Sequence, residues 1–110
     1  MSVSYSDIRR FDLPQQPLLI VCRNIFAGMG LNLVYESDGY LIGHILVLAG
    51  KSCDIVTTYV REIGSVLVTS ENKFQDFDGG RNRKMVETLF NKLEAGIEKF
   101  SIQNMEGCRR

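Results

Sequence analysis

The first third of the chain changes from an alternating pattern to a helical one. Apolar and polar residues alternate within residues 2–10, and this period of two predicts a short strand. Beyond it, apolar side chains recur three or four positions apart: Leu18, Leu19, Cys22, Ile25, Phe26 and Met29. Pro17 suits the first turn of a helix and Gly28 its end, so the spacing predicts a helix over residues 15–28.

The pattern alternates again from Leu31 to Leu48, on both sides of the dipeptide Asp38-Gly39. This dipeptide between two alternating runs predicts a hairpin with a two-residue turn. Such a turn pairs Tyr35 with Ile42, Leu33 with His44 and Leu31 with Leu46. One face of the hairpin then carries Leu31, Leu33, Tyr35, Tyr40, Ile42, His44, Leu46 and Leu48. We expect this nearly apolar set to face the helices, which leaves the other face uncovered, with Val34, Leu41, Ile45 and Val47.

The remainder of the chain predicts two further strands and a second helix. Residues 53–61 are rich in β-branched side chains and residues 65–70 have the same character, so each predicts a strand. Residues 71–80 have no period and are expected to form a loop. The last helix has the clearest apolar stripe: Met85, Val86, Leu89, Phe90, Leu93, Ile97 and Phe100. Residues 101–110 have no strong pattern, and we expect them to fray.

These elements follow the order β-α-β-β-β-β-α. Two helices can cover only one face of an antiparallel sheet, so the sequence predicts a two-layer α+β fold with four to five strands and both helices on one face. A length of 110 residues suits a single core, and we expect one domain over residues 1–110.

The same order resembles the helix-grip, or TATA-binding-protein-like, β-α-β4-α module. The similarity covers nearly the whole chain as topology. Residues 66–70, followed by an acidic and glycine-rich segment at residues 76–83, look like a strand, loop and helix start of bacterial domains of this shape. The resemblance implies a fold, and it transfers no catalytic residue to this chain.

Composition and charge narrow the class of function. Thirteen basic and thirteen acidic residues give a net charge of zero, which disfavours a protein that works by holding nucleic acid or a membrane surface. The N-terminal residues have no secretory signal pattern. Cys22, Cys53 and Cys108 lack the spacing of a metal site and fit reduced thiols. We therefore expect a cytoplasmic protein without a metal or cofactor.

The only histidine, His44, is the first candidate for chemistry. A histidine on an apolar face is most often bonded to a tyrosine or to the backbone, and no residue forms a nucleophile–base pair with it, so we expect no catalytic site. If the protein instead carries a small apolar ligand between the C-terminal helix and the sheet, the polar contacts would come from His44, Tyr35, Tyr40 and Tyr59.

Arg81, Asn82 and Arg83 form a possible anion site at the start of the last helix. Free backbone amides and two cations favour a phosphate or carboxylate there. The nearby Asp76 and Asp78 oppose an anion, and ordinary capping is the favoured interpretation.

The uncovered sheet face gives the leading hypothesis for function. Val34, Leu41, Ile45 and Val47 would form one apolar patch on neighbouring strands, and contiguous patches usually mark interfaces. We therefore expect a non-enzymatic interaction module that forms a homodimer or binds another protein through this face. The alternative is the apolar-ligand carrier described above, and an enzyme ranks third.

Overall fold

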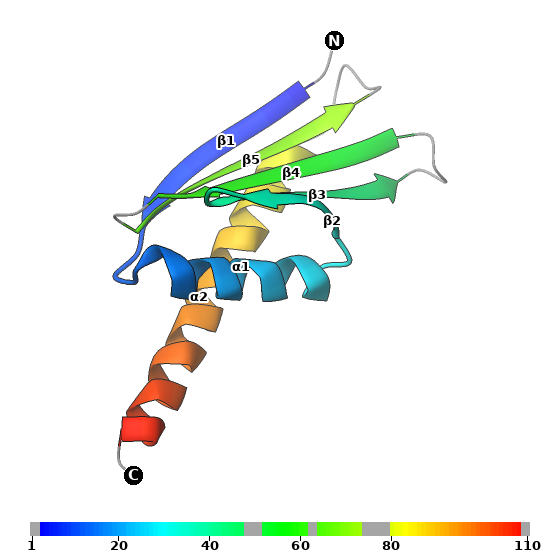
Figure 1. Ribbon diagram of the computed structural model, residues 1–110. Coiled ribbons are helices and arrows are strands. Elements are labelled where there is room, and N and C mark those ends of the chain that lie inside the picture. Colours follow the sequence, from blue (N-terminus) through cyan, green and yellow to red (C-terminus); the bar gives the residue numbers. More distant parts are fainter. Residues whose placement is uncertain (1–2, 48–51, 62–63, 74–79, 109–110) are drawn as a thin grey trace.

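The computed structural model describes residues 3–47, 52–61, 64–73 and 80–108 (Figure 1). Its elements are β1 (Val3–Arg10), α1 (Gln15–Gly28), β2 (Asn32–Ser37), β3 (Tyr40–Val47), β4 (Ser52–Val60), β5 (Ser65–Lys73) and α2 (Arg81–Cys108). The strands form one antiparallel sheet in the order β1-β5-β4-β3-β2. This is the predicted two-layer α+β fold, and α1 has the predicted bounds.

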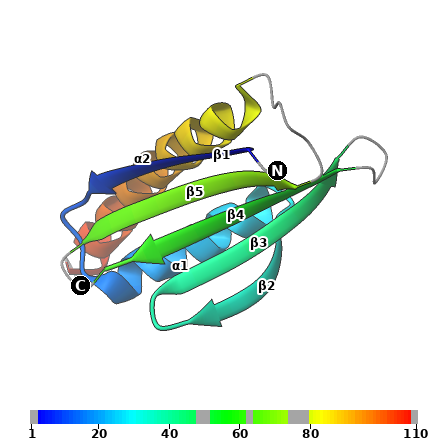
Figure 2. The ribbon, with the colours of Figure 1, turned by 90° about the horizontal axis from the view of Figure 1, so that it is seen from above.

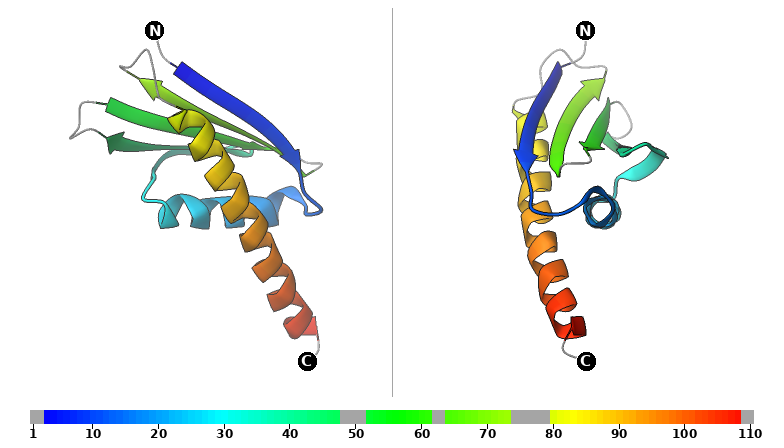
Figure 3. Two further views of the ribbon diagram at one scale, coloured as in Figure 1. Left: turned by 180° about the vertical axis from the view of Figure 1, so that it is seen from behind. Right: turned by 60° about the vertical axis from the view of Figure 1, so that its left-hand side comes forward.

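Both helices pack against the same face of the sheet and cross each other there (Figures 2 and 3). Contacts of α1 are with β2, β3 and β4, and those of α2 are with β1 and β5. With 28 residues, α2 is about 42 Å long at 1.5 Å per residue, and it extends well beyond the body of the domain. Residues 101–108, expected to fray, continue this helix because no proline interrupts them. Residues 109–110 of that tail lie outside the described part.

The core fills the space between the helices and the sheet. Its members are fully or nearly fully buried: Leu18, Cys22 and Phe26 of α1, Val86, Leu89, Phe90 and Leu93 of α2, and Leu41, Val56, Val60, Val66 and Val68 of the sheet. Phe90 and Leu93 have no exposed surface, as the helical stripe predicts.

The β2–β3 hairpin has the predicted turn but only part of the predicted register. Asp38 and Gly39 have φ angles of 52° and 87°, the positive values that a two-residue hairpin turn of this type requires. Tyr35 pairs with Ile42, as predicted. A bulge at Val34 then shifts the pairing, so that Leu33 lies opposite Gly43 rather than opposite His44. Leu31 lies before the start of β2 and is buried in the core, so the predicted pair of Leu31 with Leu46 does not form.

The face of the hairpin that packs against the helices is the opposite of the predicted one. Leu41 is fully buried, and Ile45 packs against the core. Gly43 between them lies so close to α1 that an added Cβ would stand 2.9 Å from the Phe26 ring. Strand alternation therefore places Tyr40, Ile42 and His44 on the uncovered face. Val34 is 58% exposed at the bulge, while the side chains of Leu46 and Val47 and all of Leu48 lie outside the described residues.

Strands β4 and β5 explain this choice of face. The two faces of the hairpin are similarly apolar, so the hairpin alone does not decide which one is buried. On β4 and β5 the helix-side positions carry Val56, Val60, Val66 and Val68 together with the buried polar residues Asp54, Thr58, Ser70 and Asn72, whereas the other side has Ile55, Thr57, Tyr59, Leu67 and Thr69. The four valines supply the apolar contacts of the core, and Asp54, Ser70 and Asn72 are hydrogen-bonded, so this face can be buried. Because β3 pairs with β4 in a fixed register, the buried face of β4 also determines which face of the hairpin is buried.

Candidate functional site

The uncovered face of the sheet, hereafter the open face, has three central rows of side chains that run across the strands, with the pair Arg10 and Ser65 beyond the first row and the pair Cys53 and Lys73 beyond the third. The first row is Tyr40, Tyr59, Leu67 and Ile8, the second is Tyr35, Ile42, Thr57, Thr69 and Ser6, and the third is Asn32, His44, Ile55, Glu71 and Ser4. No helix of the described chain covers these rows (Figure 2).

The first row is apolar and aromatic, and the second combines Tyr35 and Ile42 with three hydroxyl side chains. Tyr40 and Tyr59 stack across β3 and β4, with ring centroids 4.2 Å apart and planes 13° apart. Ile8 and Tyr35 are each 50% exposed and Tyr40 is 39% exposed, values that are high for large apolar side chains. Where the strands β1 and β5 meet, the hydroxyls of Ser6 and Thr69 bond to each other at 2.8 Å.

The four residues predicted to line a carrier pocket do come together, but on the wrong side of the sheet for that pocket. His44, Tyr35, Tyr40 and Tyr59 all belong to the open face, whereas α2 packs against the opposite face. They therefore cannot line a pocket between α2 and the sheet, and that assignment is wrong. The cause is the same reversal of hairpin faces that buries Leu41.

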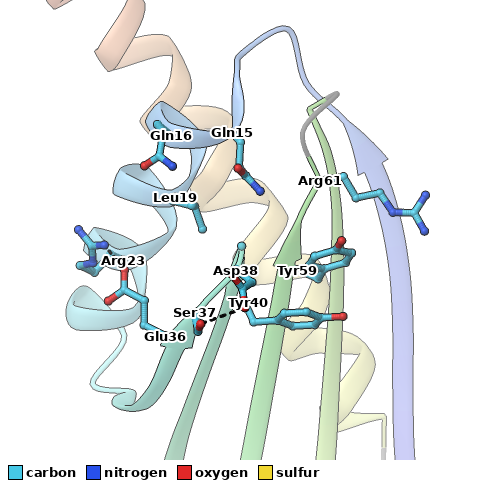
Figure 4. Close-up of a pocket in the computed structure, with 11 residues that line it drawn as sticks. Gln15, Gln16, Leu19, Arg23, Glu36, Ser37, Asp38, Tyr40, Tyr59 and Arg61 are labelled. Carbon is cyan, nitrogen blue, oxygen red and sulfur yellow. Dashed lines mark hydrogen bonds and ion pairs between the residues drawn. The ribbon is translucent and has the colours of Figure 1, made fainter.

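One corner of the open face borders a cavity of about 720 Å³ (Figure 4). It lies between the start of α1, the β2–β3 turn and the end of β4, and its lining includes Gln15, Gln16, Arg23, Glu36, Asp38, Tyr40, Tyr59 and Arg61. The Tyr40 and Tyr59 rings lie side by side at its edge, and the Arg61 side chain points away from it.

Hydrogen bonds hold the walls of this cavity. The Gln15 amide donates to the Val60 carbonyl oxygen at 2.8 Å, which ties α1 to β4. Arg23 and Glu36 form an ion pair, and this contact raises the pKa of Arg23. The lining contains neither histidine nor cysteine, and its Ser37 hydroxyl donates to the Asp38 carboxylate at 3.2 Å.

Arg81, Asn82 and Arg83 do not form the predicted anion site. Arg81 donates to the Asp54 carboxylate at 2.5 Å, and Asn82 is buried where its side-chain oxygen accepts a bond from Ser70 at 3.0 Å. Arg83 is exposed and bonds to Glu87 at 3.0 Å, which raises the pKa of Arg83. Arg81 and Arg83 therefore pair with two different carboxylates, and the described residues at the start of α2 do not bring these two cations together around one anion.

Asp54 is instead the centre of a polar cluster within the helix-covered layer, which the sequence analysis missed. Asp54 is 2% exposed and accepts from Arg81 and from Asn72, each at 2.5 Å. Asn72 is fully buried on the neighbouring β5. The signal was present in the sequence, because Asp54 lies in phase with Val56 and Val60. This cluster joins the start of α2 to β4 and β5.

Cys22 is a buried thiol of the core. Burial raises its pKa from an ordinary 9.0 to about 12. In the unfolded chain the thiol ionises near pH 9, so the stability that depends on its neutral form is complete below pH 9 and is lost as the pH rises toward 12. A shift of this size corresponds to about 4 kcal/mol at its full extent. Cys22 therefore acts as a small apolar core residue.

As the pH rises above 9, we expect the free energy of unfolding of Cys22→Ala to fall less steeply than that of the native chain. The measurement is urea unfolding at intervals from pH 8 to about pH 10.5, where only part of the effect develops. Cys53→Ala, which removes a half-buried thiol, is the matched control. Equal alkaline slopes for the native chain and Cys22→Ala would contradict the assignment.

Comparison with known proteins gives no relative: no protein-family model matches the chain, and no curated protein matches it. Among the described residues, neither helix has the length and apolar content needed to cross a membrane. The same residues contain no group of three or more His, Cys, Asp or Glu side chains placed to hold a metal ion.

Proposed function

We propose that this protein is a non-enzymatic interaction module that forms a homodimer through its open face. The observation that supports this most strongly is the contiguity of the first row, which runs from Tyr40 to Ile8 across a sheet face that no described element covers. Contiguous apolar surface of this kind usually marks a protein interface, and tyrosine is enriched in interfaces. The predicted interface through the uncovered sheet face is kept, but its side chains are those of the three rows. Leu41 and Ile45, which were predicted to form it, face the helices.

The size of the open face supports a second copy of the chain as its partner. Five strands about 4.8 Å apart, with three rows of residues about 6.8 Å apart along the strands, give on the order of 500 Å² before side-chain relief is counted. A standard interface buries about 800 Å² on each partner. The zero net charge of the chain adds no long-range repulsion between copies.

The distribution of charge favours pairing through the face rather than through a sheet edge. In the three central rows, Glu71 is the only Asp, Glu, Lys or Arg residue, while Arg10 and Lys73 occupy positions at the two ends of the open face. The β1 edge contains Asp7, Arg9 and Arg10, and the β2 edge is short and bulged at Val34. Charges and bulges oppose strand addition at an edge. Two open faces packed together are therefore the favoured assembly.

A carrier of a small apolar ligand has weaker support. Phe90 and Leu93 are fully buried in the layer between α2 and the sheet, where that ligand was expected. The resemblance to the helix-grip module stays a prediction, and the homodimer does not depend on it.

Thr57→Arg is expected to convert the dimer to a folded monomer. Thr57 lies in the middle row between Ile42 and Thr69, so an arginine there would bring an unpaired charge to the centre of the interface. We expect the dissociation constant to rise at least about 100-fold, which corresponds to about 2.7 kcal/mol. Light scattering during size exclusion and sedimentation velocity measure the mass, and circular dichroism verifies the fold.

Asn91→Arg is the matched control, since Asn91 is exposed on α2, which packs on the other side of the sheet. It should leave the dimer unchanged. A native chain that is monomeric at about 1 mM, or a Thr57→Arg variant with native mass, would contradict the homodimer.

A further inference from the structure

The two helices form a groove of about 610 Å³ that is separate from the open face. All of its lining residues come from the helices: Ile20, Val21, Asn24, Ile25 and Gly28 of α1, and Lys92, Ala95, Gly96 and Lys99 of α2. The helices touch at its floor, where a Cβ added to Gly96 would stand 2.7 Å from a Val21 methyl carbon. Ile20 is 47% exposed on its wall. The groove is therefore an apolar channel open to solvent.

The charge of this groove is positive. Lys92 and Lys99 are exposed and lie seven positions apart on α2, two helical turns or about 10.5 Å along its axis. Neither lysine forms an ion pair with an acidic residue of the described chain. No aspartate or glutamate lines the groove, and α1 contains no acidic residue at all. An occupant with negative charge would supply the missing partners.

The shape of the groove favours a helix over a small molecule. Small apolar ligands are usually buried over 70–90% of their surface, and an open channel between two helices does not enclose a ligand to that extent. An amphipathic helix can lay an apolar stripe into such a channel and keep its polar side in water. Small side chains such as Ala95 and Gly96 allow a third helix to approach closely.

We propose that the α1–α2 groove binds an amphipathic helix of a partner protein, with two acidic residues seven positions apart beside its apolar stripe. The apolar stripe packs on Ile20 and Ala95, which are both exposed, and the two carboxylates pair with Lys92 and Lys99. This site is independent of the proposed homodimer, because the helices and the open face lie on opposite sides of the sheet.

A labelled synthetic peptide tests the site. The probe is a helical peptide of about 20 residues with leucines on one face and glutamates seven positions apart beside it, and its matched partner has lysines in place of those glutamates. In fluorescence anisotropy with the full chain, we expect saturable binding of the acidic peptide and about tenfold weaker binding of the basic one. Lys92→Glu and Lys99→Glu should each weaken the acidic peptide at least about fivefold, and Ile20→Ser should weaken both peptides.

Lys84→Glu is the charge control, because Lys84 is exposed on α2 outside the groove. It should leave the affinity within about twofold of native. Equal affinities of the two peptides, no saturation below about 1 mM, or equal losses for Lys84→Glu and Lys99→Glu would each overturn the proposal. The titration is repeated with Thr57→Arg, where unchanged binding separates the groove from the open face.

Discussion

Replacing Arg81 by methionine should destabilise the fold by about 3–5 kcal/mol. The substitution keeps an apolar stem but removes the partner of Asp54, whose side chain is 3% exposed. Asn72 alone would then face a buried carboxylate, and a buried charge left without its counter-charge carries a penalty of this size. Urea unfolding at pH 7 and a fixed low protein concentration measures the loss without a contribution from self-association.

A double substitution separates the charge from other effects of the Arg81 change. Asp54→Asn in the Arg81→Met background removes the unpaired carboxylate and retains an acceptor for Asn72, so the double variant should be more stable than Arg81→Met alone. Arg83→Met is the control, because the Arg83–Glu87 pair is exposed and should contribute less than about 0.5 kcal/mol. A double variant that is no more stable than Arg81→Met alone would show that the unpaired Asp54 carboxylate is not the cause of the loss.

Phe90→Ala should also destabilise the domain by about 3–5 kcal/mol. The Phe90 ring has no exposed surface, lies 6.2 Å from the Phe11 ring and has the Arg9 guanidinium 4.6 Å from its centre. Truncation leaves a cavity and removes the contact that joins β1 and the β1–α1 connection to α2. Urea unfolding at low protein concentration again measures the change.

Leu93→Ala should lose about 2–5 kcal/mol by the same mechanism, because Leu93 is also fully buried. Val34→Ala is the control, since Val34 is 58% exposed and should change stability by less than about 0.5 kcal/mol. If Phe90→Ala does not fold, Phe90→Leu gives a graded loss that remains measurable. A loss below about 0.5 kcal/mol for Phe90→Ala would mean that α2 packs through a different face.

Local signals in the sequence were sufficient for the elements and their order. The helical stripe through Phe90 and Leu93 identifies the buried side of α2, and the Asp38-Gly39 pair fixes the hairpin turn. Both signals depend on residues close together in the chain. The fold class follows from them, because two helices and an antiparallel sheet have few ways to form two layers.

The buried face of the hairpin required information that is distant in the sequence. Leu41 and Ile42 are equally suited to a core, and β4 and β5 decide between them through Val56 and Val68. The bulge at Val34 adds a shift that the turn alone cannot predict. The open face was thus expected for the right architectural reason, but its side chains were misidentified.

The polar cluster around Asp54 shows a second limit of prediction from the sequence. Asp54 has the phase of a core position, yet its partners Asn72 and Arg81 come from another strand and from the start of α2. Arg81 was instead grouped with its sequence neighbours as a possible anion site. Only the tertiary structure shows that the anion bound by Arg81 is the Asp54 carboxylate of β4.

The position of β1 at the sheet edge has a consequence for the order in which the chain can fold. From β2 to β5, strands that are consecutive in sequence are neighbours in the sheet, so they can assemble as successive hairpins with small loop-closure entropy. β1 is made first, but its Ile8 pairs with Leu67 of β5, the last strand to be synthesised. Until β5 emerges from the ribosome, β1 has no native partner. Its closely spaced charges, Asp7, Arg9 and Arg10, keep it from joining the strands of other chains during that interval.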